Sequence, residues 1–490
     1  MLPSATANAY SRASDLSHIK GDAMAGAIET RSIDWIPTGE RRGKVHHQAP
    51  FWFTGNFVLT TMVTGFLGPA NGLSAGWSVL AAVAGACFGT FFMCFHANQG
   101  PTMGLPQMIQ SRAQFGSRGA LVPFIAVIFV YIGFNVFNTI LATSGFKTVF
   151  PGPNWLWYLG LMVAAIVIAV VGFDLMMVVQ RWLTYLLIVV FGVLTVYALS
   201  TLHLNAAVPD GGKFSLTVFL MQFAAAAGYQ ISYAVYVSDY SRYLPENTSA
   251  KHVIWWTYLG AAGSSVWLMS LGAILASALP TPDAIVSIQT VGNQLLPGFG
   301  TFTVVVASIA LVTIMSVNAY GASLTSMSAL DAFRPITPTV RLRVLGIALT
   351  SFIAFVVALS LPEGYLESFN TFVLLMLYFL IPWTAVNLVD FYFVRRGHYS
   401  IVDIFRPDGI YGRWSWRGLA AYLVGMVSMV PFISLHFYEG PIAKMLGGVD
   451  ISFVVGLAVS GLAYYVLTRG VDLAPEHAAV ERSRAELSAA

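Results

Sequence analysis

The chain has 490 residues, of which 57% are hydrophobic and 10% are charged, and its mean hydropathy is +0.72. Soluble globular proteins carry roughly a quarter charged residues, so most of this chain cannot cover a water-facing surface. Continuous apolar runs recur along its length, each of about the 20 residues that a helix needs to cross a bilayer. A membrane barrel would show shorter segments of alternating polarity. The composition therefore predicts an all-α integral membrane protein.

Taken in chain order, the apolar runs predict about twelve transmembrane helices, with boundaries good to a few residues. They cover residues 50–69, 76–97, 120–147, 155–173, 178–201, 217–243, 253–278, 299–325, 344–361, 367–393, 417–436 and 448–468. We divide the chain into an N-terminal tail (1–48), a transport core of ten helices (49–393), a connection (394–416), two peripheral helices (417–468) and a C-terminal tail (469–490). We expect the polar C-terminal tail to be mobile.

Basic residues fall mainly on alternate connections. The odd-numbered connections carry only Lys147, Lys213 and Lys444. The even-numbered connections carry Arg112, Arg118, Arg181, Arg242, Lys251, Arg334, Arg341, Arg343, Arg395, Arg396, Arg406, Arg413 and Arg417. Because Lys and Arg are enriched in cytoplasmic loops, this pattern predicts a multi-pass protein of the inner (plasma) membrane with both tails and the 394–416 connection in the cytoplasm.

The middle third of each predicted helix lacks Lys, Arg, Asp and Glu. An intramembrane charge usually marks a path for ions or a charged substrate, so the pattern favours a neutral cargo. It also argues against an enzyme, since His96 is the only histidine near a helix interior and has no evident catalytic partner. We expect no metal site, no cofactor and no nucleic-acid partner. The expected partners are a small molecule and the lipid bilayer, and we expect the monomer to be functional.

Two helices contain polar and flexible residues within their apolar runs. Helix 1 holds Thr54–Asn56, Thr60 and Thr64, and helix 6 holds Gly228-Tyr229-Gln230 followed by Ser232. These are the first helices of two five-helix halves, and interrupted helices at matching positions indicate an inverted-repeat transporter with its site at mid-membrane. Ordinary helix packing through small residues is the alternative interpretation.

Three motifs resemble the nucleobase–cation symporter-1 family in its purine–cytosine permease branch. The motifs are Glu29 with Ile33–Pro37 and Glu40-Arg41, then Gly104–Met108 with Ser111-Arg112 and Phe115-Gly116, then Tyr378–Trp383 with Asp390–Tyr392 and Arg395–Tyr399. The resemblance implies a LeuT-type fold, with helices 1–5 and 6–10 as inverted repeats and two peripheral helices. It also implies import of a neutral nucleobase or related heterocycle of the cytosine, purine, uracil or allantoin class, by cation symport with alternating access.

The loop that holds the second motif contains two arginines, Arg112 and Arg118, for which two roles stay open. They could anchor the loop to anionic headgroups. Alternatively, they could form an inner gate by pairing with Asp239 or Asp331 in one conformational state.

A flat, neutral ring is bound most simply by an aromatic face and side-chain amides. Phe134 and Asn138 lie four residues apart, on one face of helix 3, and the resemblance implies that they stack on and hold the ring; Asn135 is the register alternative. In helix 6 the family's second stacking position falls on Gln230, so Tyr229 could stack while Gln230 reads the ring edge. Gly228 would let the backbone unwind there. The predicted substrate-binding residues are Phe134, Asn138, Gly228, Tyr229, Gln230, Ser232, Asn318 and Asn56.

The coupling ion is H⁺ or Na⁺. The cation-site candidates are Thr313, Ser316 and Thr60, because sodium-using relatives bind the ion with helix 1 carbonyls and helix 8 hydroxyls. Val312 supplies no oxygen where a second hydroxyl is usual, which favours a proton. Its carrier would be Asp239, Glu363 or Glu367, near helix ends.

An amino-acid permease of the same fold remains the alternative, because the Gly65–Gly68 region could meet a substrate carboxylate.

Overall fold

The computed structural model describes residues 33–489 except 172, 335, 337–338 and 362–363. Each of the twelve predicted ranges contains helix in the part of the chain that is described. Within these described residues, eight helices are long and apolar enough to cross a membrane and three shorter apolar helices accompany them, while helix 1 is broken into short pieces. The all-α membrane architecture predicted from composition is therefore confirmed.

The first half of the core contains the following elements. They are η3 (Thr38–Glu40), η4 (Val45–His47), α2 (Gln48–Asn56), α3 (Leu59–Gly65), α4 (Leu67–Ala70), α5 (Ala75–Ala97), α6 (Gln99–Met103), α7 (Gln107–Gln110), α8 (Arg112–Phe115), α9 (Leu121–Lys147), α10 (Asn154–Val171), α11 (Phe173–Thr201) and η5 (Pro209–Gly211).

The second half and the C-terminal region follow. They contain α12 (Leu216–Ile231), η6 (Ser232–Val235), α13 (Val237–Ser241), α14 (Ala250–Ala278), α15 (Ala284–Leu295), α16 (Phe299–Asp331), α17 (Val340–Ser360), α18 (Tyr365–Val389), the π-helical η7 (Asp390–Val394), α19 (Ile401–Ile404), α20 (Trp416–Met429), η8 (Val430–Phe432), a hairpin of β1 (Ser434–Leu435) and β2 (Tyr438–Glu439), α21 (Pro441–Met445), α22 (Ser452–Thr468) and α23 (Ala474–Ala489).

Helices 1 and 6 are both interrupted, as the inverted repeat requires. In helix 1 the backbone leaves the helix at Phe57 (ψ 68°) and is extended at Val58 (φ −137°, ψ 164°). In helix 6 the interruption is η6 and ends at Tyr236 (φ −140°). The sequence predicted this second break at Gly228, which instead lies within regular α12.

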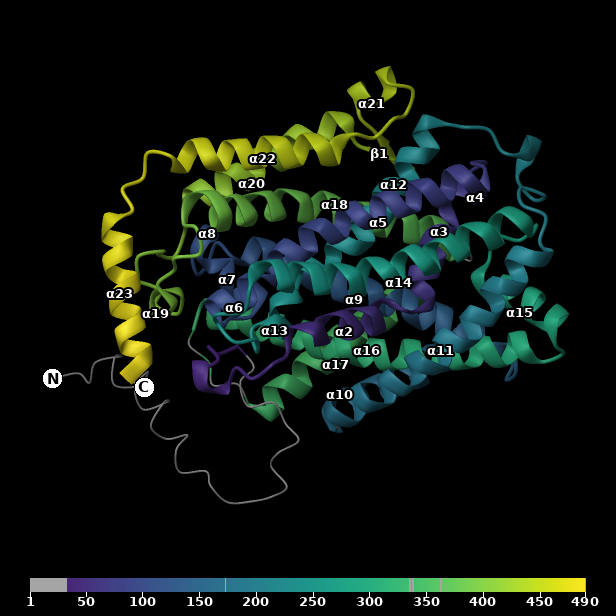
Figure 1. Ribbon diagram of the computed structural model, residues 1–490, viewed down its shortest axis with the longest axis horizontal. Helices are drawn as coiled ribbons and strands as arrows, with labels where there is room; N and C mark the ends of the chain where they lie inside the picture. Colours follow the sequence, from purple (N-terminus) through teal and green to yellow (C-terminus); the bar gives the residue numbers. More distant parts are fainter. Residues whose placement is uncertain (1–32, 172, 335, 337–338, 362–363, 490) are drawn as a thin grey trace.

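The long helices run roughly parallel between two ends (Figure 1). Short elements α6, α7, α8, α13, α19 and α23 gather at one end, which we call the α13 end. The opposite end carries α4, α15 and α21, and we call it the α15 end. Helices α20 and α22 pack together at the edge of the bundle, in the place expected of two peripheral helices.

The C-terminal tail is not the mobile segment that its composition suggested. Residues 474–489 form α23, which packs against α19 and buries Ala479, Val480 and Ser483. Arg395 holds the helix at the α13 end, because its guanidinium pairs with Asp390 and Glu476, each at 2.5 Å. Burial lowers the pKa of Arg395, but its four neighbours Asp390, Tyr464, Glu476 and Tyr399 outweigh burial and hold that pKa well above its usual value.

Candidate functional site

A central cavity of about 860 Å³ lies between the two broken helices and helices α9 and α16. Phe134, Asn138 and Tyr229 line its deeper part, and Asn318 and Thr60 belong to the same lining. The lining continues to Glu40 and Arg242, which belong to the α13 end. Five of the residues predicted to bind substrate or cation therefore share one cavity.

Asn138 presents an unsatisfied amide nitrogen at this cavity. Its side chain is 1% exposed, and its Oδ1 accepts a hydrogen bond from Thr60 Oγ1 at 3.2 Å. Its Nδ2 has no partner among the described residues. A buried polar group without a partner needs an explanation, and a ligand that accepts from Nδ2 supplies one. The register alternative, Asn135, donates instead to the Met315 carbonyl at 3.1 Å and lies outside the cavity lining.

Two aromatic rings lie beside this amide. Phe134 and Tyr229 meet edge to face, with ring centroids 5.3 Å apart and an interplanar angle of 85°. The Tyr229 hydroxyl lies 2.8 Å from Thr61 Oγ1, which itself donates to the Asn56 carbonyl at 2.6 Å. The break in helix 1 therefore positions Tyr229, and the two rings present perpendicular surfaces for a flat molecule.

Asn56 and Gln230 lie behind the cavity wall. Asn56 Nδ2 donates to the Ala261 carbonyl at 2.9 Å and contacts Ser265 Oγ, both on α14. Gln230 is fully buried, and its Nε2 donates to the same Ala261 carbonyl at 3.3 Å. Neither side chain lines the cavity, so in this conformation both join the broken helices to α14.

Gly228 and Ser232 also lie outside the cavity lining. A Cβ on Gly228 would lie 2.4 Å from the Val373 carbonyl oxygen, so this glycine allows α12 to approach α18 closely. Ser232 Oγ donates to the Tyr229 carbonyl at 2.6 Å, at the point where α12 becomes η6. The predicted unwinding at Gly228 is corrected to a packing role.

The cation-site candidates do not converge. Thr313 Oγ1 donates to the Ala310 carbonyl at 2.7 Å, and Ser316 Oγ donates to the Thr313 carbonyl at 2.6 Å. Both hydroxyl protons thus bond back to α16 itself. Thr60 faces Asn138 rather than this pair.

The aromatic residues that line the cavity toward the α13 end were not predicted from the sequence. The cavity is also lined by Trp52, Tyr131, Tyr233, Tyr236 and Tyr240. Tyr131 and Tyr236 stack with centroids 5.5 Å apart and 22° between their planes. A signal was available, since Tyr229, Tyr233, Tyr236 and Tyr240 follow the spacing of one helical face.

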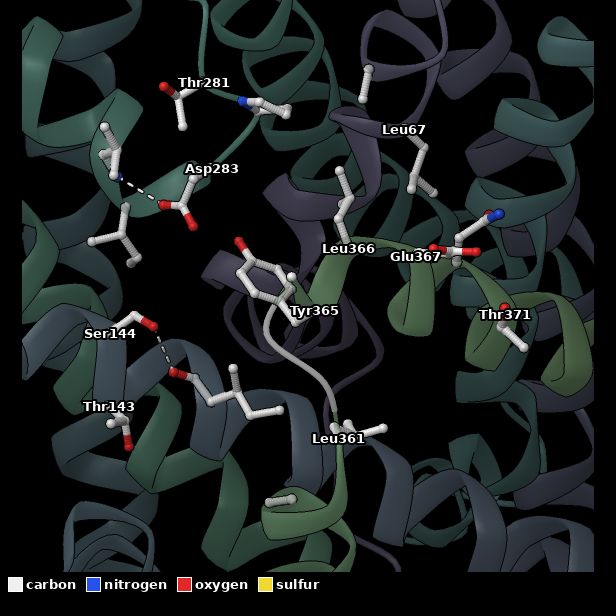
Figure 2. Close-up of a pocket in the computed structure, with 18 of the residues that line it drawn as sticks. Leu67, Thr143, Ser144, Thr281, Asp283, Leu361, Tyr365, Leu366, Glu367 and Thr371 are labelled. Carbon is white, nitrogen blue, oxygen red and sulfur yellow. Dashed lines mark hydrogen bonds between the residues drawn. The ribbon is translucent and has the colours of Figure 1, made fainter. Parts of the chain in front are cut away.

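A second cavity of about 1140 Å³ opens near α15. Figure 2 shows Tyr365, at the start of α18, pointing toward Asp283, which caps α15 by accepting from Val286 N at 2.9 Å. Glu367 lies in the same wall and pairs with His436 at 2.9 Å, with both side chains largely exposed. These two cavities therefore lie toward opposite ends of the bundle.

The charged groups considered in the sequence occupy distinct places. Arg112 is 2% exposed and pairs with Asp331 at 3.2 Å, joining α8 to the end of α16. Asp239 is half-buried, lines the central cavity and accepts from Gln107 N at 2.8 Å. Glu363 lies outside the described residues.

Sequence relatives of known class cover almost the whole chain. The chain is 39% identical over 449 residues to the putative purine-cytosine permease YxlA of Bacillus subtilis, covering 90% of this chain and 96% of the relative. It is 25% identical over 470 residues to the purine-cytosine permease FCY2 of Saccharomyces cerevisiae, covering 90% and 85%.

Solved structures support the fold. The inward-facing conformation of Mhp1 matches with a TM-score of 0.72 and 18% identity, covering 91% of this chain and 94% of that chain. A closed conformation of Mhp1, a nucleobase-cation-symport-1 family transporter with bromovinylhydantoin bound, matches with a TM-score of 0.73 and 18% identity, covering 94% and 99%. At this identity the likeness establishes the LeuT-type fold alone.

The family profile described as permease for cytosine/purines, uracil, thiamine and allantoin matches residues 35–456. This match confirms the resemblance drawn from the three motifs and identifies a transporter, not an enzyme. It does not favour the amino-acid permease alternative. The chain belongs to the family of permeases for cytosine and purines, uracil, thiamine and allantoin.

Proposed function

We propose that this protein imports a neutral nucleobase of the purine–cytosine class by secondary active transport with alternating access. The observation that carries the proposal is the unsatisfied Nδ2 of Asn138 beside the perpendicular rings of Phe134 and Tyr229. A nucleobase has ring nitrogens and carbonyl oxygens that accept from an amide, and a flat face that stacks on an aromatic ring. The purine-cytosine permeases among the relatives support this substrate class.

We further propose that the α13 end faces the cytoplasm of a plasma-membrane protein. The basic residues of the even-numbered connections support this orientation, and Arg112, Arg242 and Arg395 all belong to this end. Because Phe134, Asn138 and Tyr229 line the cavity that reaches this end and do not line the cavity near α15, we take the conformation to be open toward the cytoplasm. A reporter fused at the C-terminus should be active in the cytoplasm, and activity in the periplasm would reverse the assignment.

We assign the coupling ion as a proton. Support comes from Val312, which provides no side-chain oxygen beside Thr313, and from Thr60, which faces Asn138 rather than Thr313 and Ser316.

A substrate panel tests the proposed cargo. A host lacking its own nucleobase transporters would express the protein and be offered radiolabelled cytosine, adenine, hypoxanthine, uracil, allantoin and leucine. We expect uptake of cytosine and of at least one purine, with competition between them. Uptake of leucine alone would refute the proposal and restore the amino-acid permease alternative.

A further inference from the structure

A chain of buried polar side chains begins beside the α13 end of the central cavity. It starts at His96 on α5, whose side chain is fully buried, and ends at Asp390 on η7, which is also fully buried. Each member contacts the next in the order His96, Gln107, Gln99, Asn387, Gln114 and Asp390. Substrate recognition as described above uses none of them.

The amides of this chain all donate toward the Asp390 carboxylate. Gln99 Nε2 donates to Asn387 Oδ1 at 2.6 Å, and Asn387 Nδ2 donates to Gln114 Oε1 at 3.3 Å. Gln114 Nε2 then donates to Asp390 Oδ2 at 2.6 Å. The same carboxylate accepts from Arg395, Tyr399 and Tyr464. Because Asp390 accepts at each of these contacts, it sets the direction of the whole chain.

At the end of the chain of side chains opposite Asp390, the direction of these hydrogen bonds places a donor against His96. Gln107 Nε2 lies 3.2 Å from His96 Nδ1 and 3.0 Å from Gln99 Oε1. An amide nitrogen donates and does not accept, so Nδ1 accepts and the neutral ring carries its proton on Nε2. Within the described residues, His96 Nε2 and Gln107 Oε1 both lack partners. Unsatisfied atoms on these two contacting side chains indicate that a second arrangement uses them.

The surroundings also contain what a protonated ring would need. His96 stacks on Trp383 with centroids 4.5 Å apart and 6° between the planes, and an aromatic face attracts a cation. Trp383 Nε1 donates to Ser111 Oγ at 3.0 Å, which fixes the indole plane. Turning the Gln107 amide over would present its unsatisfied oxygen to a protonated Nδ1. That rotation breaks the bond to Gln99, so the intact chain of amides opposes it.

Hydrogen bonds join this histidine to the gate of the transport site. Gln107 N donates to Asp239 Oδ1 at 2.8 Å, and Ser238 Oγ donates to the His96 carbonyl at 3.0 Å. Both partners belong to α13, which follows the break in helix 6 and lines the central cavity. A movement of α13 during the transport cycle would therefore change how Gln107 meets His96.

The titratable and charged groups on α13 and η7 do not contact the His96 ring directly. From α13, Asp239 reaches it only through Gln107 N. From η7, Tyr392 bonds to the Phe95 carbonyl at 2.9 Å, and Asp390 lies at the far end of the amides. On α5 itself, the neighbour is the buried thiol of Cys94. In these contacts the ring meets Gln107 and Trp383 directly, and the Gln99 side chain also interacts with it and favours its protonated form. The orientation of the Gln107 amide then decides whether ring Nδ1 meets a donor or an acceptor.

We propose that His96 binds the coupling proton. The imidazole takes up a proton in the conformation open to the outside and releases it in the conformation described here, where Gln107 offers only a donor. The only bond formed and broken is one ring N–H, and the proton passes from the external medium to the cytoplasm. This inference rests on the proton coupling proposed above and adds the group that carries the proton.

Transport by the purified full-length protein in proteoliposomes tests the proposal with radiolabelled cytosine. One measurement is accumulation driven by an acid exterior, and the other is counterflow exchange with equal pH on both sides. The variants are His96→Gln and His96→Asn, which keep a neutral amide near Nε2 and Nδ1 respectively. His203→Gln is the matched control, because His203 is exposed and lies after α11, away from the amide chain.

We expect both His96 variants to exchange cytosine like the wild type but to lose accumulation, so that cytosine only equilibrates. The His203→Gln variant should keep both activities. Accumulation by either His96 variant would overturn the proposal, and loss of exchange together with accumulation in both would assign His96 to packing instead. The wild-type protein tests proton coupling separately. If its accumulation of cytosine requires a sodium gradient and does not respond to the pH gradient, the coupling ion is not a proton.

Discussion

In the proposed function, substrate recognition depends most directly on the amide of Asn138. We predict that Asn138→Ala weakens apparent cytosine affinity by about 5- to 150-fold, the equivalent of the roughly 1–3 kcal/mol that an unmet buried hydrogen bond costs. The reason is that alanine leaves the cargo's acceptor buried without its Nδ2 donor. The measurement is the KM of uptake, with surface expression quantified in parallel.

The neighbouring Asn135→Ala variant is the matched control for Asn138→Ala. Asn135 donates to the Met315 carbonyl, so its loss should lower the amount of folded protein while the KM stays close to the wild-type value. If Asn138→Ala has a normal KM and Asn135→Ala has a raised KM, then Asn135 and not Asn138 binds the substrate.

How far the site could be predicted also becomes clear at individual residues. Phe134, Asn138 and Tyr229, which were predicted because an amide within an apolar helix is rare and the motif order supplied the register, all line the central cavity. Asn56 and Gln230 were assigned to substrate by the same reasoning, but their amides bond to α14. Sequence alone cannot separate these two uses, because both place a polar group at mid-helix and only tertiary contacts show which partner satisfies it.

Among the helical elements, α12 depends on close approach to α18. We predict that Gly228→Ala lowers the melting temperature in detergent, because its Cβ would lie 2.4 Å from the Val373 carbonyl oxygen. Overpacking of this kind typically costs about 1–3 kcal/mol. Gly55→Ala is the control on the broken helix 1, since its Cβ would meet nothing within 4 Å. Equal stability of the two variants would contradict the packing role.

The docking of α23 makes a second prediction at the level of elements. Glu476→Gln should lower the melting temperature and expose α23 to limited proteolysis, because the Arg395 and Glu476 side chains are only 15% and 11% exposed. Removing one partner of a buried ion pair leaves the other charge without part of its compensation. In Glu486→Gln, the lost partner is the half-exposed Arg406, and such pairs contribute about 0–1 kcal/mol. A larger loss in Glu486→Gln would show that the helix docks differently.

The same helix shows where prediction of elements from sequence reaches its limit. Apolar runs located the spans well, because a bilayer imposes one length on every crossing. The tail offered no such constraint: it is polar, and its order depends on partners in the 395–406 region. The break in helix 6 was displaced for a related reason, since Gly228 serves both as a helix breaker and as a packing residue, and the sequence does not show which use applies.

At the scale of the whole molecule, the two cavities and the two broken helices act together in transport. The central cavity reaches the α13 end, while the second cavity near α15 lies on the opposite side of the Phe134–Phe372 and Phe137–Phe369 ring contacts. Alternating access requires that these two spaces open in turn. The driving ion must therefore bind with different affinity in the two conformations, since an ion with equal affinity for both shifts nothing.

Coupling to protons makes a prediction about the intact protein in cells. Cytosine uptake should rise as external pH falls, stop when a protonophore is added, and stay unchanged when choline replaces sodium. The sign follows from symport, because a lower external pH increases both the occupancy of the proton site and the inward gradient. If removing sodium at constant pH abolishes uptake, sodium is the coupling ion. The Thr313 oxygen, whose proton bonds to the Ala310 carbonyl here, would then be the first candidate ligand, and Thr313→Val would abolish the response to sodium.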